Sequence, residues 1–108
     1  MNGMHVIGDA DTVLAFALGG VAGSVVTTAA DVRATLVAAA DAVRAHGHEA
    51  RRPLLVLITR SAAALATDDV RRMTLDPTAP LLLVIAGYGE GGGAVVDDFV
   101  ERVLGVRQ

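Results

Sequence analysis

Two aspartates stand where this sequence could bind a metal ion. Asp9 and Asp11 directly follow residues 4–7, an apolar stretch typical of a strand, which Gly8 ends. In doubly wound α/β folds, ligands bind at the carboxyl edge of the sheet, where this pair would lie. Carboxylate oxygens there could bind Mg²⁺. The interpretation we favour is simpler, namely that Asp9 or Asp11 caps the helix that follows and complements its dipole.

A phosphoacceptor receiver domain would need two further residues. One is an aspartate at the end of the third strand, but the third apolar run ends Ile58-Thr59-Arg60. The other is a later lysine, and the chain contains none. A degenerate receiver-like interaction domain therefore stays as an alternative, without phosphorylation.

A glycine-rich stretch at residues 87–93 contains G-x-G-x-x-G at Gly87, Gly89 and Gly92. A dinucleotide fingerprint has this spacing between a strand and a helix. It also needs an acidic residue about 20 positions later, on a following strand, and the sequence ends at Gln108. We therefore expect a flexible loop and no cofactor, with a small-ligand-binding domain as the alternative.

Histidine and serine offer little further chemistry. His46-Gly47-His48-Glu49 resembles a metal patch only weakly, and we expect it to be solvated surface. His5 lies within the first predicted strand and should make a local hydrogen bond. Ser24 and Ser61 have no identifiable histidine partner in the sequence, so no nucleophilic triad is predicted.

Composition sets the remaining limits. The chain has 108 residues, which suits one domain, and is 53% hydrophobic but only 3% aromatic, so its core must consist of Ala, Val, Leu and Ile. A net charge of −3 argues against nucleic-acid binding. The absence of cysteine fits a cytoplasmic protein. No apolar run approaches the ~20 residues of a transmembrane helix, so any membrane role must be indirect.

Apolar runs alternate with helical patterns along the chain. Capping-box spacing at Thr28 and Asp31 opens the clearest helix, whose apolar stripe is Val32, Leu36, Ala39 and Val43. Residues 54–58 and 81–85 are apolar at every position, which is typical of strands covered on both faces. The predicted strands are 4–7, 24–27, 54–58 and 81–85, and the predicted helices are 9–18, 28–46, 61–73 and 94–104.

This alternation predicts a single α/β domain with a doubly wound sheet. Strands that are separated by helices must be parallel, which gives a four-stranded sheet in the order 2-1-3-4 with helices on both faces. Within it we expect a core at residues 1–86, a glycine-rich loop at 87–93, and a C-terminal helix at 94–105 that can move as a unit. The apolar side of this helix either closes the core or docks a partner.

The segment from Val6 to Val21 resembles the N-terminal signature of the F subunit of V/A-type ATPases, which reads G-D-x-D-T-V and then L-A-G-V. Gly19 replaces the usual alanine, and the end of the chain, residues 100–106, resembles the family's last helix. The family usually has a proline-containing loop where residues 87–93 lie, and Arg60 stands where an acid is common. The matching signature residues are Gly8, Asp9, Asp11, Thr12, Val13, Phe16, Leu18, Gly20 and Val21.

The resemblance implies a non-catalytic component of the central rotor stalk on the cytoplasmic side of the membrane. Such a component binds the coiled-coil D subunit and couples ATP turnover to ion transport, and its C-terminal helix can reach the catalytic head. No cofactor, metal or nucleic acid is implied. We expect the D subunit to bind the last helix and the glycine-rich loop, through Tyr88, Phe99, Arg102, Val103 and Val106.

Overall fold

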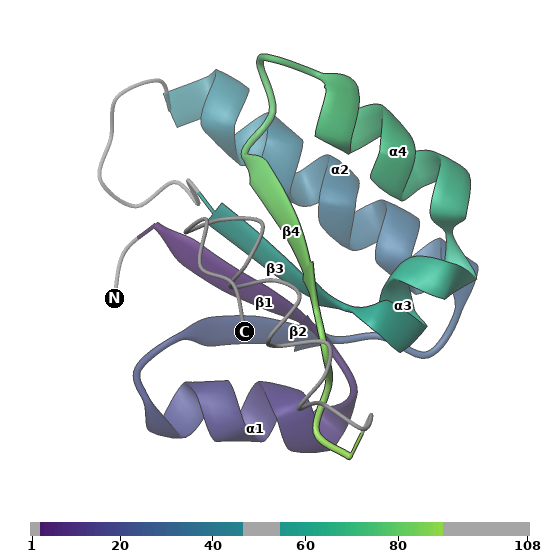
Figure 1. The fold of residues 1–108 in the computed structure, drawn as a ribbon. Coiled ribbons are helices and arrows are strands. Elements are labelled where there is room, and N and C mark those ends of the chain that lie inside the picture. Colours follow the sequence, from purple (N-terminus) through teal and green to yellow (C-terminus); the bar gives the residue numbers. More distant parts are fainter. Residues whose placement is uncertain (1–2, 47–54, 90–108) are drawn as a thin grey trace, which may run out of the picture.

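Residues 3–46 and 55–89, which the computed structural model describes, form a four-stranded sheet with helices on both faces (Figure 1). The strands are β1 (Met4–Gly8), β2 (Ala22–Val25), β3 (Leu55–Thr59) and β4 (Leu81–Ile85). All pairings are parallel, and the strand order is β2-β1-β3-β4. The predicted fold class and strand order are therefore confirmed.

The helices divide unevenly between the two faces of the sheet. They are α1 (Ala10–Leu18), α2 (Ala29–His46), α3 (Arg60–Leu65) and α4 (Thr67–Leu75). Of the helices within residues 3–46 and 55–89, Figure 1 shows α1 on one face of the sheet, and α2 beside α4 on the other. Two cores follow from this layout, because side chains alternate between the faces along each strand.

The core on the α2 side is the larger one. Neighbouring residues of β3 illustrate the alternation: Ile58 packs into the α2-side cluster, while Leu57 packs into a smaller cluster with Val6 and Val21 on the α1 side. The predicted stripe of α2 is largely correct, since Val32, Leu36 and Ala39 are buried, and Val43 is half-buried. The other members of the large cluster are Ile7, Val26, Ala40, Val56, Ala62, Ala66, Met73 and Leu82.

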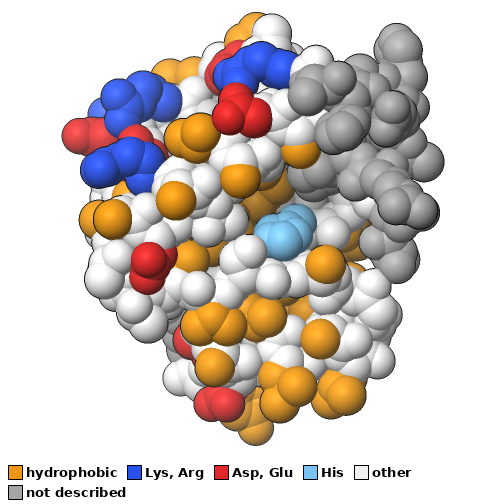
Figure 2. All heavy atoms as spheres, turned by 180° about the vertical axis from the view of Figure 1, so that it is seen from behind, with side chains coloured by type: hydrophobic (Ala, Val, Ile, Leu, Met, Phe, Trp, Pro, Cys, Tyr) orange, Lys and Arg blue, Asp and Glu red, His pale blue; other side chains and the backbone are white. Residues whose placement is uncertain are grey.

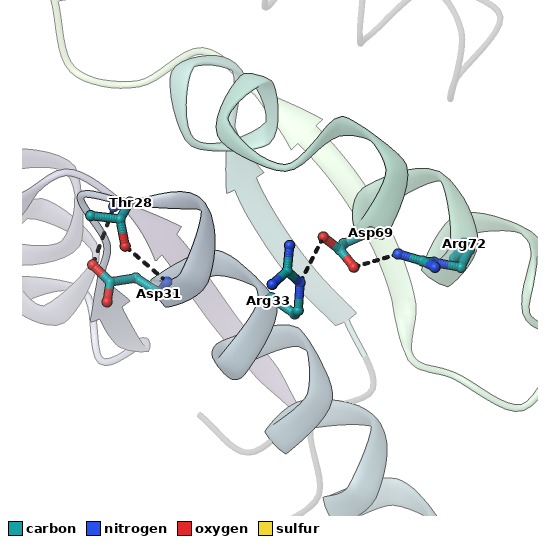
Figure 3. Close-up of polar contacts among 5 residues, drawn as sticks. All are labelled: Thr28, Asp31, Arg33, Asp69 and Arg72. Carbon is teal, nitrogen blue, oxygen red and sulfur yellow. Dashed lines mark hydrogen bonds and ion pairs between the residues drawn. The ribbon is translucent and has the colours of Figure 1, made fainter.

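The capping box predicted for α2 is present (Figure 3). The Thr28 hydroxyl accepts a hydrogen bond from the Asp31 N–H at 3.1 Å, and Asp31 Oδ2 accepts one from the Thr28 N–H at 3.2 Å. Asp31 Oδ2 also accepts from the N–H and the hydroxyl of Thr27. These hydrogen bonds lower the pKa of the Asp31 carboxyl, so the box is strongest when Asp31 is ionised.

The second strand was predicted two residues too late. The pair Val25-Val26 suggested a strand at 24–27, but β2 ends at Val25. The Val26 N–H still donates to the Gly8 carbonyl at 3.0 Å, and then Thr27 is held by Asp31. Thr27 therefore belongs to the cap of α2 and not to the strand that the apolar pattern had predicted.

The single helix predicted at 61–73 is wrong. The chain breaks at Ala66, whose φ of −146° and ψ of 61° are not helical, so that α3 and α4 form separately. Asp68 and Asp69, which interrupted the predicted helix, lie in the first turn of α4. Acidic residues are favourable there because they complement the helix dipole.

The continuous apolar run of β4 was also over-interpreted. The run of β3 is buried as predicted, but Leu81 and Val84 of β4 are 64% and 42% exposed. In the described part of the chain β4 is an edge strand, so fewer elements cover it. The predicted helix at 94–104, and the loop beyond Gly89, lie outside the described residues.

Candidate functional site

Asp9 is a helix cap in this structure. Its Oδ2 accepts from the Thr12 N–H at 3.1 Å, and its Oδ1 accepts from the Thr12 hydroxyl at 2.6 Å. The hydrogen bond from that hydroxyl is the main reason why the pKa of Asp9 lies below its usual value. This confirms capping by Asp9. Asp11 is exposed in the first turn.

Metal binding gains no support at this edge of the sheet. Both Asp9 oxygens are engaged by Thr12. Within residues 3–46 and 55–89, no three His, Cys, Asp or Glu side chains gather closely enough to hold a metal ion. The patch around His46 and His48 cannot be placed, because these side chains lie outside the described part.

Thr12 joins the start of α1 to the segment after β4. This side chain is only 3% exposed. Its hydroxyl donates to Asp9 and accepts from the Tyr88 N–H at 2.8 Å, across 76 positions of sequence. Nothing in the sequence pattern pointed to this link, since a threonine inside a helix is usually interpreted as a surface residue. The consequence is that the backbone at Tyr88 is held against α1.

Gly8 allows close packing between β1 and β3, and Gly23 allows close packing of β2 against β1 and α1. A Cβ at Gly8 would lie 2.5 Å from Thr59 Cγ2, and a Cβ at Gly23 would lie 2.8 Å from the Val6 carbonyl oxygen. Gly20, just after α1, has a φ of +91°, which favours glycine. Val13 and Phe16 pack against the smaller core. Most of the signature residues therefore have a packing or backbone role.

Leu18 is a clear exception among the signature residues, and it belongs to an exposed apolar surface. Leu14 is 60% exposed, Leu18 is 83% exposed, and Tyr88 is 74% exposed. Together with Asp11 and Ala15 they line a shallow hollow of about 280 Å³. We call this surface, made of Asp11, Leu14, Ala15, Leu18 and Tyr88, the α1 face.

A second hollow lies between the β2 edge of the sheet and α2. Its volume is about 390 Å³. His5 Nε2 lies 2.9 Å from Ser24 Oγ in its wall, so Ser24 has the histidine partner that the sequence did not reveal, and His5 makes its expected hydrogen bond. Burial lowers the pKa of His5. The other lining residues are Ala34, Thr35, Ala38, Ala39 and Ala42.

The His5–Ser24 pair does not amount to a catalytic triad. A triad needs a third group that orients the histidine, and none of the described residues that line this hollow is a carboxylate. Neutral imidazole is favoured by burial, and it can hydrogen-bond the serine as a structural pair across β1 and β2. The hollow is distinguished by its place beside β2 and by the His5–Ser24 hydrogen bond. The described residues that line it do not form a set of converging reactive groups.

The outer surface of α2 and α4 carries ion pairs. Asp69 Oδ2 lies 3.2 Å from Arg33 Nε, and Asp69 Oδ1 lies 2.6 Å from Arg72 Nη2 (Figure 3). Arg44 pairs with Asp41 at 2.9 Å. Charges of opposite sign are therefore matched within this surface, which suits a face that meets water.

Of the predicted contacts with a D subunit, the structure places only one. Tyr88 is exposed beside α1, where it forms part of the α1 face. Phe99, Arg102, Val103 and Val106 lie outside the described residues. Leu14 was not among the predicted contact residues, and Leu18 was predicted only as a signature residue. Their exposure could not be inferred from a pattern in which apolar residues are frequent.

Comparison with known proteins identifies the family. The family described as ATP synthase (F/14-kDa) subunit matches residues 4–103, which is nearly the whole chain. No curated protein sequence gives a significant match. Among the described residues, no helix combines the length and hydrophobicity that a membrane crossing requires. The chain therefore belongs to the family of ATP synthase (F/14-kDa) subunits, the F subunits of V/A-type ATP synthases.

Proposed function

We propose that this chain is the F subunit of the central rotor stalk, where it binds the coiled-coil D subunit. It would turn with the D subunit and so couple ATP turnover in the catalytic head to ion transport in the membrane. The observation that carries this proposal is the family match over residues 4–103. We place the protein on the cytoplasmic side, as a peripheral part of the complex.

The polar groups at the carboxyl edge of the sheet support a mechanical role. Asp9 and Thr12 are used in the cap of α1, and the buried Thr59 hydroxyl caps α3 by accepting from the Ala62 N–H at 3.2 Å. In the described part, every buried side-chain nitrogen or oxygen has a hydrogen-bond partner. Such an edge offers rigidity, and it leaves few groups ready to act on a substrate.

The proposed contact with the D subunit includes Tyr88 and the residues that follow it. An aromatic side chain that is 74% exposed and fixed at its backbone suits a contact residue. Phe99, Arg102, Val103 and Val106 complete the proposed contact on the C-terminal side. Arg102 would add a charged contact that tunes specificity more than affinity.

The test is co-expression with the D subunit of the same organism, followed by size-exclusion chromatography with light scattering. We expect one stable complex with one copy of each chain. Phe99→Ala should weaken that complex without unfolding the chain, and truncation after Gly93 should weaken it further. Separate elution of two folded proteins would contradict the proposed function. In that case a rise in melting temperature with Mg²⁺ or a nucleotide would support a ligand-binding domain instead.

A further inference from the structure

The helix α1 presents two stripes, and the fold uses only one of them. The inner stripe consists of Thr12, Val13 and Phe16, which are buried or half-buried against the sheet. The outer stripe has Asp11, Leu14, Ala15 and Leu18 at positions i, i+3, i+4 and i+7. This spacing places the four residues on one side of a helix.

The outer stripe forms a continuous surface and not a set of isolated apolar residues. Single exposed leucines are common on protein surfaces. Here Leu14 and Leu18 share one hollow with Tyr88, which comes from the far end of β4. An exposed apolar surface that gathers residues from two separate elements is typical of an interaction site.

The α1 face is preformed. The Tyr88 backbone is fixed by its 2.8 Å hydrogen bond to the buried Thr12. On its other side α1 packs directly over Gly23, where a Cβ would lie 2.9 Å from Val13 Cγ1. A rigid surface loses little conformational entropy when it binds, which favours affinity.

The charge of this part of the molecule indicates the chemistry of its partner. Residues 1–32 contain Asp9, Asp11 and Asp31 but no lysine or arginine, and all nine arginines occur from Arg33 onward. On the side that Figure 2 shows, the lower part of the molecule, where α1 lies, has hydrophobic and acidic side chains and no basic ones among the described residues. A second copy of the same face therefore cannot supply a cation opposite Asp11, whereas a different chain can.

We propose that the α1 face is the docking surface for one α-helix of the D subunit, a deeper statement that rests on the proposed function. The helix would present apolar residues at three- and four-residue spacing against Leu14, Leu18 and Tyr88, with a lysine or arginine opposite Asp11. The stripe from Asp11 to Leu18 is about 10 Å long at 1.5 Å per residue. It would therefore contact about two turns of the partner helix.

The experiment compares charged substitutions at matched exposed leucines. Leu14→Glu/Leu18→Glu places two carboxylates on the α1 face, and Leu75→Glu is the control because Leu75 is 73% exposed on α4. The Kd for the full-length D subunit is measured by biolayer interferometry for each full chain. Circular dichroism and the melting temperature show whether each variant is folded. If the double variant does not fold, the single variant Leu18→Glu replaces it in the binding measurement.

We expect the double variant to weaken binding at least 100-fold, while Leu75→Glu stays within twofold of wild type. Asp11→Arg should weaken binding about tenfold at low salt and less at high salt, because screening reduces the repulsion from the partner's cation. Unchanged affinity in the folded double variant would overturn this inference and leave the proposed function standing. Failure of the wild-type chain to bind the D subunit would overturn both. If the double variant changes the self-association of the isolated chain but not its affinity for the D subunit, the α1 face binds a second copy of this chain. That result would also overturn the inference.

Discussion

The two faces of the sheet are covered by helices that meet their surroundings differently. On the α2 side, the helices bury the larger core and turn paired charges outward, such as Arg33, Asp69 and Arg72. On the α1 side, in the part of the chain that the structure describes, one short helix covers a core of three buried residues and turns Leu14 and Leu18 outward. We infer that the α2 side mainly stabilises the domain and that the α1 side provides the proposed contact surface.

The largest expected effect compares adjacent residues of β3 that point to opposite faces. Ile58 is fully buried in the larger core, and Leu57 is 7% exposed in the smaller one. Ile58→Ala should lower the free energy of unfolding by about 4 kcal/mol, and Leu57→Ala by about 2 kcal/mol, because fewer buried neighbours surround the smaller cavity. Urea denaturation measures both. Equal losses in the free energy of unfolding would contradict the proposal that the α2-side core contributes more to stability than the α1-side core.

Close packing of α1 on β2 gives the next effect. Gly23→Ala should destabilise the domain by about 2 kcal/mol, because the new Cβ would meet Val13 Cγ1 of α1 at 2.9 Å and the Val6 carbonyl oxygen at 2.8 Å. Gly19→Ala is the matched control, since its Cβ would have an ordinary contact of 3.5 Å with the Phe16 carbonyl. Thermal unfolding of both variants separates the two cases. A harmless Gly23→Ala would mean that α1 is not seated as tightly as the structure indicates.

A somewhat smaller effect is expected for the link between α1 and Tyr88. Thr12→Val removes the hydroxyl that Tyr88 and Asp9 share, and should cost about 1–2 kcal/mol. It should also raise the pKa of Asp9 and speed hydrogen exchange at the Tyr88 amide, while Thr12→Ser should preserve both. Nuclear magnetic resonance reports each quantity. Unchanged exchange at Tyr88 in Thr12→Val would remove the reason to call the α1 face preformed.

The smallest effect concerns pH and the His5–Ser24 pair on the α2 side. Burial lowers the pKa of His5 from its ordinary value of 6.5. The unfolded chain therefore takes up the proton first, so stability is complete above pH 6.5 and falls as the pH drops through that value. The pKa values of Asp9, Asp31 and Asp76 are lowered from 3.8, so these carboxylates change the stability only as the pH falls below that value. Measurements from about pH 7.5 to about pH 5 therefore isolate the contribution of histidine to the stability.

The matched variants identify which histidine is responsible. His5→Gln should flatten the dependence of melting temperature on pH in this range. His46→Gln/His48→Gln should retain it, because those two histidines are predicted to be solvated. An unchanged slope in His5→Gln would assign the dependence to another group.

Much of this fold could be predicted because local signals agree with the final packing. The cap at Thr28, the stripe of α2 and the apolar runs of β3 and β4 all point to one parallel sheet. The errors arise where tertiary contacts override a local pattern, as at Ala66, which is buried where the helix breaks. The alternation of strands and helices predicted parallel strands, and the order 2-1-3-4 came from the expectation of a doubly wound sheet with helices on both faces.

The site was less predictable for a physical reason. Asp9 could be recognised as a cap, since its partner Thr12 is three residues away. The contacts of Thr12 with Tyr88, and of His5 with Ser24, join residues 76 and 19 positions apart. Spacing along the chain carries no information about such pairs. The outward position of Leu18 likewise depends on which side of α1 the sheet covers.

The most direct test of the contact surface is site-specific photo-crosslinking within the complex. Benzoylphenylalanine would replace Leu18 on the α1 face in one sample and Leu75 on α4 in another, each in the full chain with the D subunit. We predict a crosslink to the D subunit from position 18 and none from position 75. A crosslink from position 75 alone, in a complex that still forms, would contradict the proposed contact surface and place the partner on the α2 side.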